Sequence, residues 1–459
     1  MPTSAPTPTI DLRHAIAIGT PASIDTWLDE VDDPTRRADE LTDLTKVEVR
    51  TLADLLSPEA AADLVDTLDL HVAVDAVRLV PPRAVANMVE ALESDRAAEL
   101  LRELTPTERE GILSLVTPEQ AAILRALLDW PQESVAAHMV PEVLTVSAHV
   151  SAAEAIKQVR NHRAKLRQDS HIGAYVFAID ADNRLVGVVS FRELVLADAD
   201  RSVSDLVEED VITVGPLMDQ EAAARTLTKH RLLAIPVVDE DNHLLGILTA
   251  DDASDIAEEE ATEDAERQGG SEPLEVPYLR ASPFLLWKKR IVWLLVLFLA
   301  AAYTGTVMQA FEDELEAVVV LAFFIPLLIG TGGNTGTQIT TTLIRAMSID
   351  NVRLRDVGKV LRKEMATGVM VAAAMAAAGL VRAWTLGVGV PVMITVSVAL
   401  VAIVLWSAFI ASVIPLLLKK LRVDPAVVSG PMISTIVDGT GLIIYFSTAK
   451  LLLPELAGL

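Results

Sequence analysis

The sequence predicts a multidomain membrane protein with three parts in order: a superhelical α-helical domain, a repeated α+β pair, and an all-α polytopic domain with five spans. Three observations predict it. The chain of 459 residues is too long for one domain, its charge balance changes near residue 285, and five apolar segments follow. Residues 1–284 carry 24 Lys and Arg against 54 Asp and Glu, whereas residues 285–459 carry 14 against 10.

The composition also excludes several functions. A net charge of −26 repels polyanions, so we expect no nucleic-acid partner. The absence of Cys rules out disulfides and thiolate metal sites. Residues 1–10 are rich in Pro and Thr and lack the basic-then-apolar pattern of a signal peptide. We therefore expect the acidic part to remain in the cytoplasm.

Residues 21–136 are predicted to form an α-helical domain behind a flexible N-terminus, residues 1–20. Short helical patterns are separated by Ser-Pro, Thr-Pro or Pro-Pro pairs at 57–58, 81–82, 105–106 and 117–118. A Ser or Thr in such a pair can cap a helix that begins at the Pro. Stacked short helices predict a small α-solenoid. His71 has no partner at metal-ligand spacing, so we expect no catalytic site here.

Residues 137–264 contain an internal repeat. The segment from Val150 matches the segment from Met218, and two apolar strands around an acidic, Asn-containing turn follow each. Such turns between β-branched runs predict two hairpins. The repeat resembles a tandem pair of cystathionine-β-synthase (CBS) modules.

In the CBS family a Gly-x-x-Ser/Thr-x-x-Asp motif touches the ribose of an adenosine nucleotide. The second copy has the motif complete as Gly246, Thr249 and Asp252, and the first copy has Gly187, Ser190 and Glu193. The resemblance implies ATP or a relative as a candidate ligand. Many such pairs are purely structural, so both interpretations stay open.

Residues 251–264 carry a run of carboxylates at spacings of three and four, at which like charges repel on a helix. A solvated face or linker is one interpretation. Binding of a divalent cation through oxygen ligands is the other, and the acidic balance favours it. Residues 265–290 then form a linker, with a Gly-Gly hinge at 269–270 and an amphipathic connector helix.

Residues 291–459 are predicted to form the transmembrane domain. Five apolar segments are long enough to cross a hydrocarbon core of about 30 Å at about 1.5 Å per residue. They lie at 291–310, 317–341, 366–384, 390–418 and 431–453. Twelve Lys and Arg flank these segments on one side, and two on the other. The acidic part is therefore expected to be cytoplasmic and the C-terminus to lie outside.

Asp438 is the one carboxylate near the middle of a predicted span. A charge there costs roughly 2.5–3.5 kcal/mol, so it is a functional-site hypothesis. The alternative is an Asp that caps a helix in a polar bend. The second span carries Gly-Thr-Gly-Gly-Asn-Thr-Gly at 330–336, which is either a packing face or the lining of a water-filled path. We expect this stretch to face Asp438, because together they offer only oxygen donors suited to a hard cation.

These features together resemble the MgtE family of Mg²⁺ channels, which join an α-helical N-domain, a CBS pair, a connector helix and five spans. The stretch at 330–336 carries the resemblance, together with Val-Asp-Pro-Ala at 423–426, Asp-Gly-Thr-Gly at 438–441 and Glu-Glu-Ala-Thr-Glu-Asp at 259–264. Trp-Pro-Gln-Glu-Ser at 130–134 is similar to that family's Tyr-Pro-Glu-Asp-Ser.

The resemblance implies a homodimer that is not an enzyme and that takes up Mg²⁺ through the cell membrane. A pair of Asp438 side chains on the two-fold axis would hold a largely hydrated Mg²⁺. The implied pore residues are Asp438, Asn334, Ser434, Gly330, Gly430 and Thr440. Cytoplasmic Mg²⁺ would close the channel by binding to acidic residues, namely Asp251, Asp252, Asp255, Glu258, Glu259, Glu263, Asp424, Glu93, Asp95 and Glu99.

One departure from the family is Ser-Gly-Pro at 429–431, where Ser-Asn-Pro is usual, so Gly430 stands in place of a pore-lining amide. Thr337 and Ile339 also differ from the polar residues expected beside Gln338. The competing hypotheses are an ion-coupled secondary transporter of Co²⁺ or Mn²⁺, for which no inverted repeat or proton relay is visible, and a membrane-anchored CBS nucleotide sensor. An intramembrane aspartyl protease would need two facing carboxylates, and each chain offers one.

Overall fold

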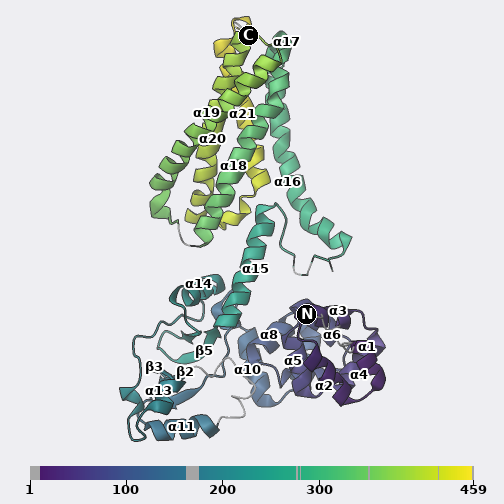
Figure 1. Ribbon diagram of the computed structural model, residues 1–459, viewed down its shortest axis with the longest axis vertical. Helices are drawn as coiled ribbons and strands as arrows, with labels where there is room; N and C mark the ends of the chain where they lie inside the picture. The colour runs from purple at the N-terminus through teal and green to yellow at the C-terminus, as the bar shows by residue number, and fades with distance from the viewer. Residues whose placement is uncertain are drawn as a thin grey trace, which may run out of the picture. The chain divides into compact units, whose positions relative to one another are not determined.

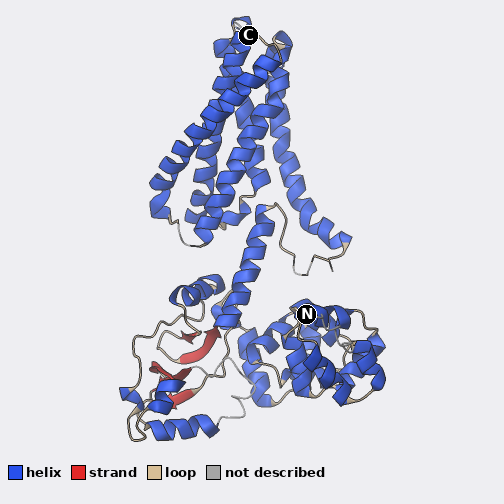
Figure 2. Cartoon of the chain, in the orientation of Figure 1, coloured by secondary structure: helices blue, strands red, loops and turns tan. Residues whose placement is uncertain are grey.

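The computed structural model describes residues 11–161, 175–274, 276, 278–279, 281–349, 352–421 and 423–456. The chain divides into two compact units, Met1–Glu258 and Glu259–Leu459. The first unit contains many short helices and all the strands that the structure describes, and the second is a bundle of long helices (Figures 1 and 2). The predicted multidomain, mostly helical membrane protein is confirmed.

Ten short helices occupy the described chain between residues 12 and 128. They are α1 (Leu12–Ile18), α2 (Pro21–Glu30), α3 (Pro34–Thr42), α4 (Lys46–Leu55), α5 (Pro58–Asp66), α6 (Leu70–Val77), α7 (Pro82–Val89), α8 (Ser94–Arg102), α9 (Pro106–Leu113) and α10 (Pro118–Leu128). Ser57 and Thr105 cap α5 and α9 as predicted, whereas the Thr117 side chain makes no capping bond at α10. Their shared core includes fully buried Trp27 and Leu100.

The first helix differs from the sequence expectation. Residues 12–18 fall in the segment predicted to be flexible, but they form α1. Leu12 and Ile16 are buried in the same core as Trp27, and Asp11 caps the helix by accepting the Arg13 N–H. Residues 1–10 of that segment lie outside the described residues.

The repeated modules follow. The first has a three-stranded sheet in the order β1 (Thr145–Ser147), β2 (Tyr175–Ile179) and β3 (Leu185–Ser190), and the second has β4 (Ala234–Val238) paired with β5 (Leu244–Thr249). β1 and β2 are parallel, and both hairpins are antiparallel. The other elements are η1 (Val135–Ala137), α11 (Ala152–Asn161), α13 (Phe191–Leu196), η3 (Val203–Asp205), α14 (Gln220–His230) and α15 (Ala250–Gln268). The part of the first repeat at residues 162–174 lies outside the described residues.

The two hairpin turns have the same chemistry. Asp180 accepts the backbone N–H groups of residues 182 and 184 at 2.8 and 2.9 Å, and Asp239 accepts those of residues 241 and 243 at 2.9 and 2.8 Å. Asn183 and Asn242 adopt positive φ angles of 65° and 67°, which Asn tolerates. The predicted repeat and its two hairpins are therefore confirmed.

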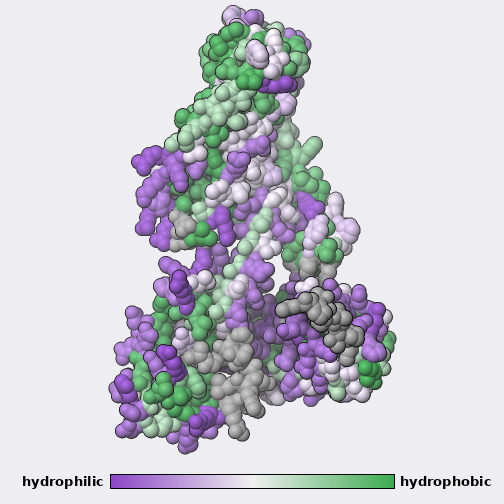
Figure 3. Space-filling model, in the orientation of Figure 1, coloured by the Kyte–Doolittle hydropathy of each residue, from purple (hydrophilic) through white to green (hydrophobic). Residues whose placement is uncertain are grey.

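The second unit contains five described helices that are long and apolar enough to cross a membrane, as predicted. The elements are α16 (Pro283–Ala310), α17 (Glu312–Ala317), η4 (Val319–Phe324), α18 (Ile325–Ser348), η5 (Leu354–Asp356), α19 (Val357–Thr385), α20 (Val390–Lys420), η6 (Pro425–Val427), α21 (Gly430–Leu452) and η7 (Pro454–Leu456). Apolar side chains are frequent on the face of the bundle that Figure 3 shows, with polar side chains among them.

The helices of the bundle differ in how far they are buried. α18, α20 and α21 form a common core that contains Leu328, Ile403 and Val437. α16 is almost wholly exposed, which suits a helix that faces lipid. Its first turns, from Pro283 to Trp287, belong to the segment predicted as a connector, so the end of the connector and the first span form one continuous helix.

Candidate cation path and sensor residues

Small residues on α18 let α20 and α21 approach closely. A Cβ atom at Gly332 would lie 2.7 Å from Ile403 and 2.8 Å from Val437, and one at Gly336 would lie 2.6 Å from Ile433. Ser407 of α20 donates a hydrogen bond to the Gly332 carbonyl at 2.7 Å. The packing interpretation of these glycines is therefore correct for Gly332 and Gly336.

The same helix pair brings Asp438 against the polar stretch, as expected. A Cβ at Gly333 would lie 3.0 Å from Ser434 Oγ and 3.5 Å from Asp438 Oδ1. Thr337 Oγ1 donates to the Gly430 carbonyl at 3.3 Å and lies 3.4 Å from Ser434 Oγ. Asp438 is half-buried, and within the described chain no hydrogen bond or ion pair engages its carboxylate. This acid therefore lies beside hydroxyl and carbonyl oxygens, and no described residue supplies a counter-charge to it.

Other predicted pore residues are placed differently. Asn334 and Gly330 are exposed in the single chain and lie one turn apart on α18. Polar side chains within a span normally face protein or water rather than lipid. Thr440 faces α20 instead, because its hydroxyl accepts the Trp406 Nε1–H at 2.9 Å. A Cβ at Gly430 would lie 2.8 Å from Thr337 Cγ2, so the Thr side chain fills the space beside this glycine.

In the first unit, buried Asp95 of α8 interacts electrostatically with half-buried Asp252 at the start of α15. Burial raises the pKa of Asp95 well above its usual range, and the charge of Asp252 adds to this effect. Burial also raises the pKa of Asp252 to about 6, while the hydrogen bond from the Thr249 hydroxyl opposes it. Asp95 Oδ1 has no hydrogen-bond partner in the described structure. A cation would relieve the repulsion between these two acids.

Two further predicted sensor residues lie near this pair. Burial raises the pKa of Asp255, and the positive charge of Arg96 opposes that shift. Arg96 also forms an ion pair with Glu99, with Nη1 and Oε2 2.5 Å apart. The guanidinium therefore partly neutralises this acidic surface.

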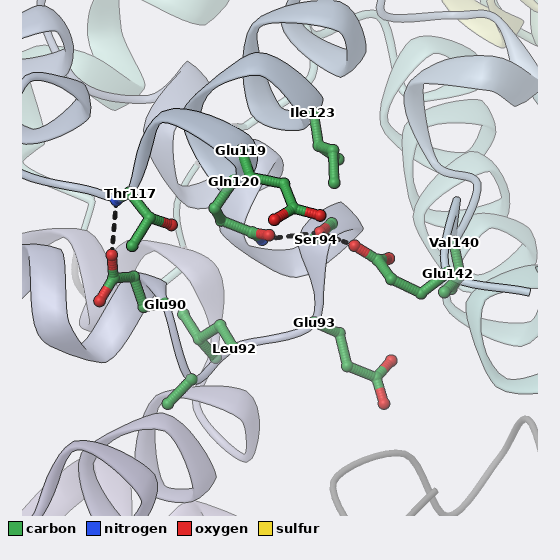
Figure 4. A pocket seen from close by; sticks show the side chains of 11 residues that line it. Glu90, Leu92, Glu93, Ser94, Thr117, Glu119, Gln120, Ile123, Val140 and Glu142 are labelled. Atoms are coloured by element: carbon green, nitrogen blue, oxygen red, sulfur yellow. Dashed lines mark hydrogen bonds between the residues drawn. The ribbon is translucent and has the colours of Figure 1, made fainter. Parts of the chain in front are cut away.

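Glu93 lines a cavity of about 270 Å³ in the first unit (Figure 4). Four glutamates contribute to its wall: Glu90, Glu93, Glu119 and Glu142. Ser94 Oγ donates to Glu142 Oε1 at 2.5 Å and accepts from Gln120 Nε2 at 2.9 Å. The cavity is acidic, but its hydroxyl and amide are already hydrogen-bonded within the protein.

The remaining sensor candidates lie along α15 and in the loop before α21. Asp251 and Glu258 belong to the first unit, and Glu259, Glu263 and Asp424 to the second. Arg267 pairs with Asp424, with Nη1 2.7 Å from Oδ2, and it also pairs with Glu263. Among the described residues, no three His, Asp or Glu side chains cluster closely enough to hold a metal ion.

The nucleotide motif of the second module has a structural role of its own. A Cβ at Gly246 would lie 2.7 Å from the Val140 carbonyl, so a glycine is needed where the chain at Val140 approaches β5. Thr249 Oγ1 donates to Asp252 Oδ2 at 2.5 Å, and Ser190 bonds Glu193 in the same way at 2.8 Å in the first module. The hydroxyls and acids of both motifs are paired with each other.

Gly333 belongs to the stretch that was expected to face Asp438, whereas Thr337 was noted only as a departure from the family pattern and Arg267 had no predicted role. Thr337 lies three residues after Asn334, and Gly333 lies four before Thr337, so helical spacing places both near the predicted face. Arg267 lies four residues after Glu263, which is the spacing of a helical ion pair. These spacings were the available signals.

The fold and this geometry define a class: a polytopic membrane protein with a pair of modules of the CBS type and an acid within its helix bundle. The MgtE family, described as a divalent cation transporter, matches residues 325–448. The MgtE intracellular N domain matches residues 32–133, and the CBS domain matches 134–200 and 203–258.

The chain is 36% identical over 351 residues to the magnesium transporter MgtE of Thermus thermophilus, which covers 76% of each chain. It is 32% identical over 336 residues to that of Enterococcus faecalis, which covers 72% of each. A solved cytosolic domain of the Mg²⁺ channel MgtE in complex with ATP is 25% identical, over 54% of this chain and 99% of that one, with a TM-score of 0.49. The chain belongs to the MgtE family.

Proposed function

We propose that this protein is a homodimeric channel that takes up Mg²⁺ across the cell membrane, with the two Asp438 side chains facing each other on the two-fold axis. The observation that carries the proposal is the half-buried Asp438 carboxylate, which has no partner in the described chain and lies beside Gly333 and Ser434. Relatives of the chain are named magnesium transporters. The basic flanks of the spans favour a C-terminus outside the cell.

The chemistry of the path suits a hydrated divalent ion. Mg²⁺ loses its water reluctantly, so a pore that contacts its hydration shell avoids most of the dehydration cost. Two carboxylates balance a divalent charge and hold a monovalent ion less well. Asn334, exposed on α18, adds an amide that can bind this shell, and Gly330 leaves its backbone accessible.

Closure would follow from the acidic residues of the cytoplasmic part. Mg²⁺ bound near Asp95 and Asp252 removes their repulsion and favours the closed state, and its loss favours the open one. Asp252 also belongs to the nucleotide motif. An adenine nucleotide such as ATP at Gly246, Thr249 and Asp252 would therefore change the Mg²⁺ affinity of the sensor.

Growth of a bacterial strain that lacks its own Mg²⁺ uptake systems tests this function. We expect the wild-type chain to rescue growth at low Mg²⁺ and Asp438→Ala to fail at equal membrane abundance. Glu316→Gln removes one negative charge from an exposed position and is the matched control, which should rescue growth. Full rescue by Asp438→Ala would contradict the proposal.

A further inference from the structure

Arg267 lies between two acids that the family resemblance assigns to the cytoplasmic sensor. Its Nη1 atom lies 2.7 Å from Asp424 Oδ2, and its other terminal nitrogen pairs with Glu263. The second Asp424 oxygen accepts the Ala426 N–H at 2.8 Å. One guanidinium therefore contacts both carboxylates, which come from α15 and from the loop between α20 and α21, and its single positive charge offsets one of their two negative charges.

The backbone around Arg267 is held in place by neighbouring contacts. Gly270, with a φ of 76°, follows α15, and a Cβ there would lie 2.8 Å from the Trp293 ring. Trp293 Nε1 in turn donates to Ser429 Oγ at 3.1 Å, and Ser429 caps α21, the helix that carries Asp438. The end of α15 is thus connected through two contacts to the pore helix.

We propose that Arg267 is a tethered counter-ion, which occupies the space between Glu263 and Asp424 and must be displaced when cytoplasmic Mg²⁺ binds there. This inference rests on the proposed function. The two carboxylates fit a hard cation, because both already contact one positive group and supply oxygen ligands. Arg267 would raise the Mg²⁺ concentration at which the channel closes, since ion and guanidinium compete for the same oxygens.

The ion pairs are weak enough to be displaced. The side chains of Arg267, Glu263 and Asp424 are 36%, 31% and 39% exposed, so water and ions reach all three. Exposed pairs of this kind contribute little each, and we expect loss of the guanidinium to lower the Mg²⁺ midpoint by about two- to tenfold. If the Arg267 ion pairs had only a structural role, their loss would loosen the attachment of α15. The Mg²⁺ midpoint would then rise rather than fall.

The test compares wild type, Arg267→Gln and Arg267→Lys as full-length protein in detergent. Protection against chymotrypsin is measured as a function of Mg²⁺ concentration, and the substitutions leave the chymotrypsin cleavage sites intact. Inhibition of flux by Mg²⁺ is measured separately in liposomes. Arg125→Gln is the matched control, because Arg125 also forms an exposed ion pair, with Glu110 at 3.1 Å. We expect a lower midpoint in Arg267→Gln alone, with Arg267→Lys near wild type because it keeps the charge.

Each result decides the matter. Suppose that Mg²⁺ protects the wild type but the Mg²⁺ midpoint of Arg267→Gln is unchanged or higher. That result overturns the inference but not the proposed function. An equal shift in Arg125→Gln also overturns it, because the effect would then be one of general charge. If Arg267→Gln does not fold, Asp424→Asn replaces it in the test. A Mg²⁺ midpoint of Asp424→Asn equal to that of wild type overturns the inference, because Asp424 is a proposed ligand of the shared site. A wild type without Mg²⁺ protection overturns both.

Discussion

The surroundings of two aspartates differ in a way that matches their proposed roles. An acid within a membrane helix is costly unless water, a cation or hydrogen-bond donors reach it. Asp438 has no such donor among the described residues, whereas Asp424 binds both a backbone N–H and Arg267. The proposed function therefore has Asp438 available to a passing ion, and the further inference has Asp424 exchange Arg267 for Mg²⁺.

Glu40 gives a prediction about pH at the residue scale. Burial raises the pKa of Glu40, but hydrogen bonds from the Leu12 N–H, Arg36 and Trp27 outweigh it, so the pKa is lowered. Its stabilising effect is complete above the unfolded pKa and is lost as pH falls through the lower folded value. We expect Glu40→Gln to destabilise α1–α3 by about 1–3 kcal/mol at pH 7.

Hydrogen exchange of the α1–α3 peptides in the full chain measures this effect. The difference between Glu40→Gln and wild type should narrow as the pH falls from the unfolded Glu pKa of about 4.3 through the lower folded pKa of Glu40, because the wild-type carboxylate then becomes protonated. A difference that is the same at pH 7 and at low pH would contradict the assigned charge. Glu59→Gln, at an exposed position in α5, is the control.

Residue identity alone predicted part of the candidate path. Asp438 stands out in the sequence because a charge in an apolar segment is a local signal. The contact of Thr337 with Gly430 depends instead on how α18 and α21 are rotated against each other, which no local pattern fixes. Thr440 was expected among the pore residues with Asp438. Two residues apart on a helix, however, the two side chains point in different directions, and the Thr440 hydroxyl accepts the Trp406 Nε1–H.

At the scale of elements, the glycines of α18 set the distance between helices. A Cβ at Gly336 would lie 2.6 Å from Ile433 and 2.8 Å from Ser407 Oγ, closer than real Cβ contacts. We expect Gly336→Ala to destabilise the bundle by about 1–3 kcal/mol through overpacking. Thermal unfolding in detergent and Mg²⁺ flux measure the effect.

Gly305 of α16 provides the matched comparison, because a Cβ there has no atom within 4 Å. Gly305→Ala should retain both stability and flux. Equal stability of the two variants would argue against the close α18–α21 approach. The sequence left open whether these glycines pack or line a path, because small residues serve both purposes. The structure separates the buried positions from exposed Gly330.

Elements were easier to predict than their ends. The five spans and both hairpins could be predicted because apolar length and Asn-containing turns are local properties. The first span was predicted to begin at residue 291, eight residues after the start of α16, because the basic residues at 288–290 look like the boundary between connector and span. In the structure Ser282 caps the helix, and it continues through the basic residues.

At the scale of the whole molecule, the account requires two chains. The chain contains no Cys, so a single substitution introduces a unique thiol. We expect Asn334→Cys to form covalent dimers with a short bifunctional thiol reagent in membranes, because its face would line the two-fold axis. Val369→Cys, which is 56% exposed on α19, is the control and should remain monomeric. Dimers from Val369→Cys alone would place the interface elsewhere.

The most direct test of the central claim is Mg²⁺ flux through purified protein in liposomes, compared between wild type, Asp438→Asn and Glu316→Gln. Asn keeps the size of the side chain and removes its charge. The account predicts that Asp438→Asn loses nearly all Mg²⁺ flux while Glu316→Gln keeps it. Equal flux through Asp438→Asn and wild type would contradict the claim that a pair of Asp438 carboxylates holds the ion.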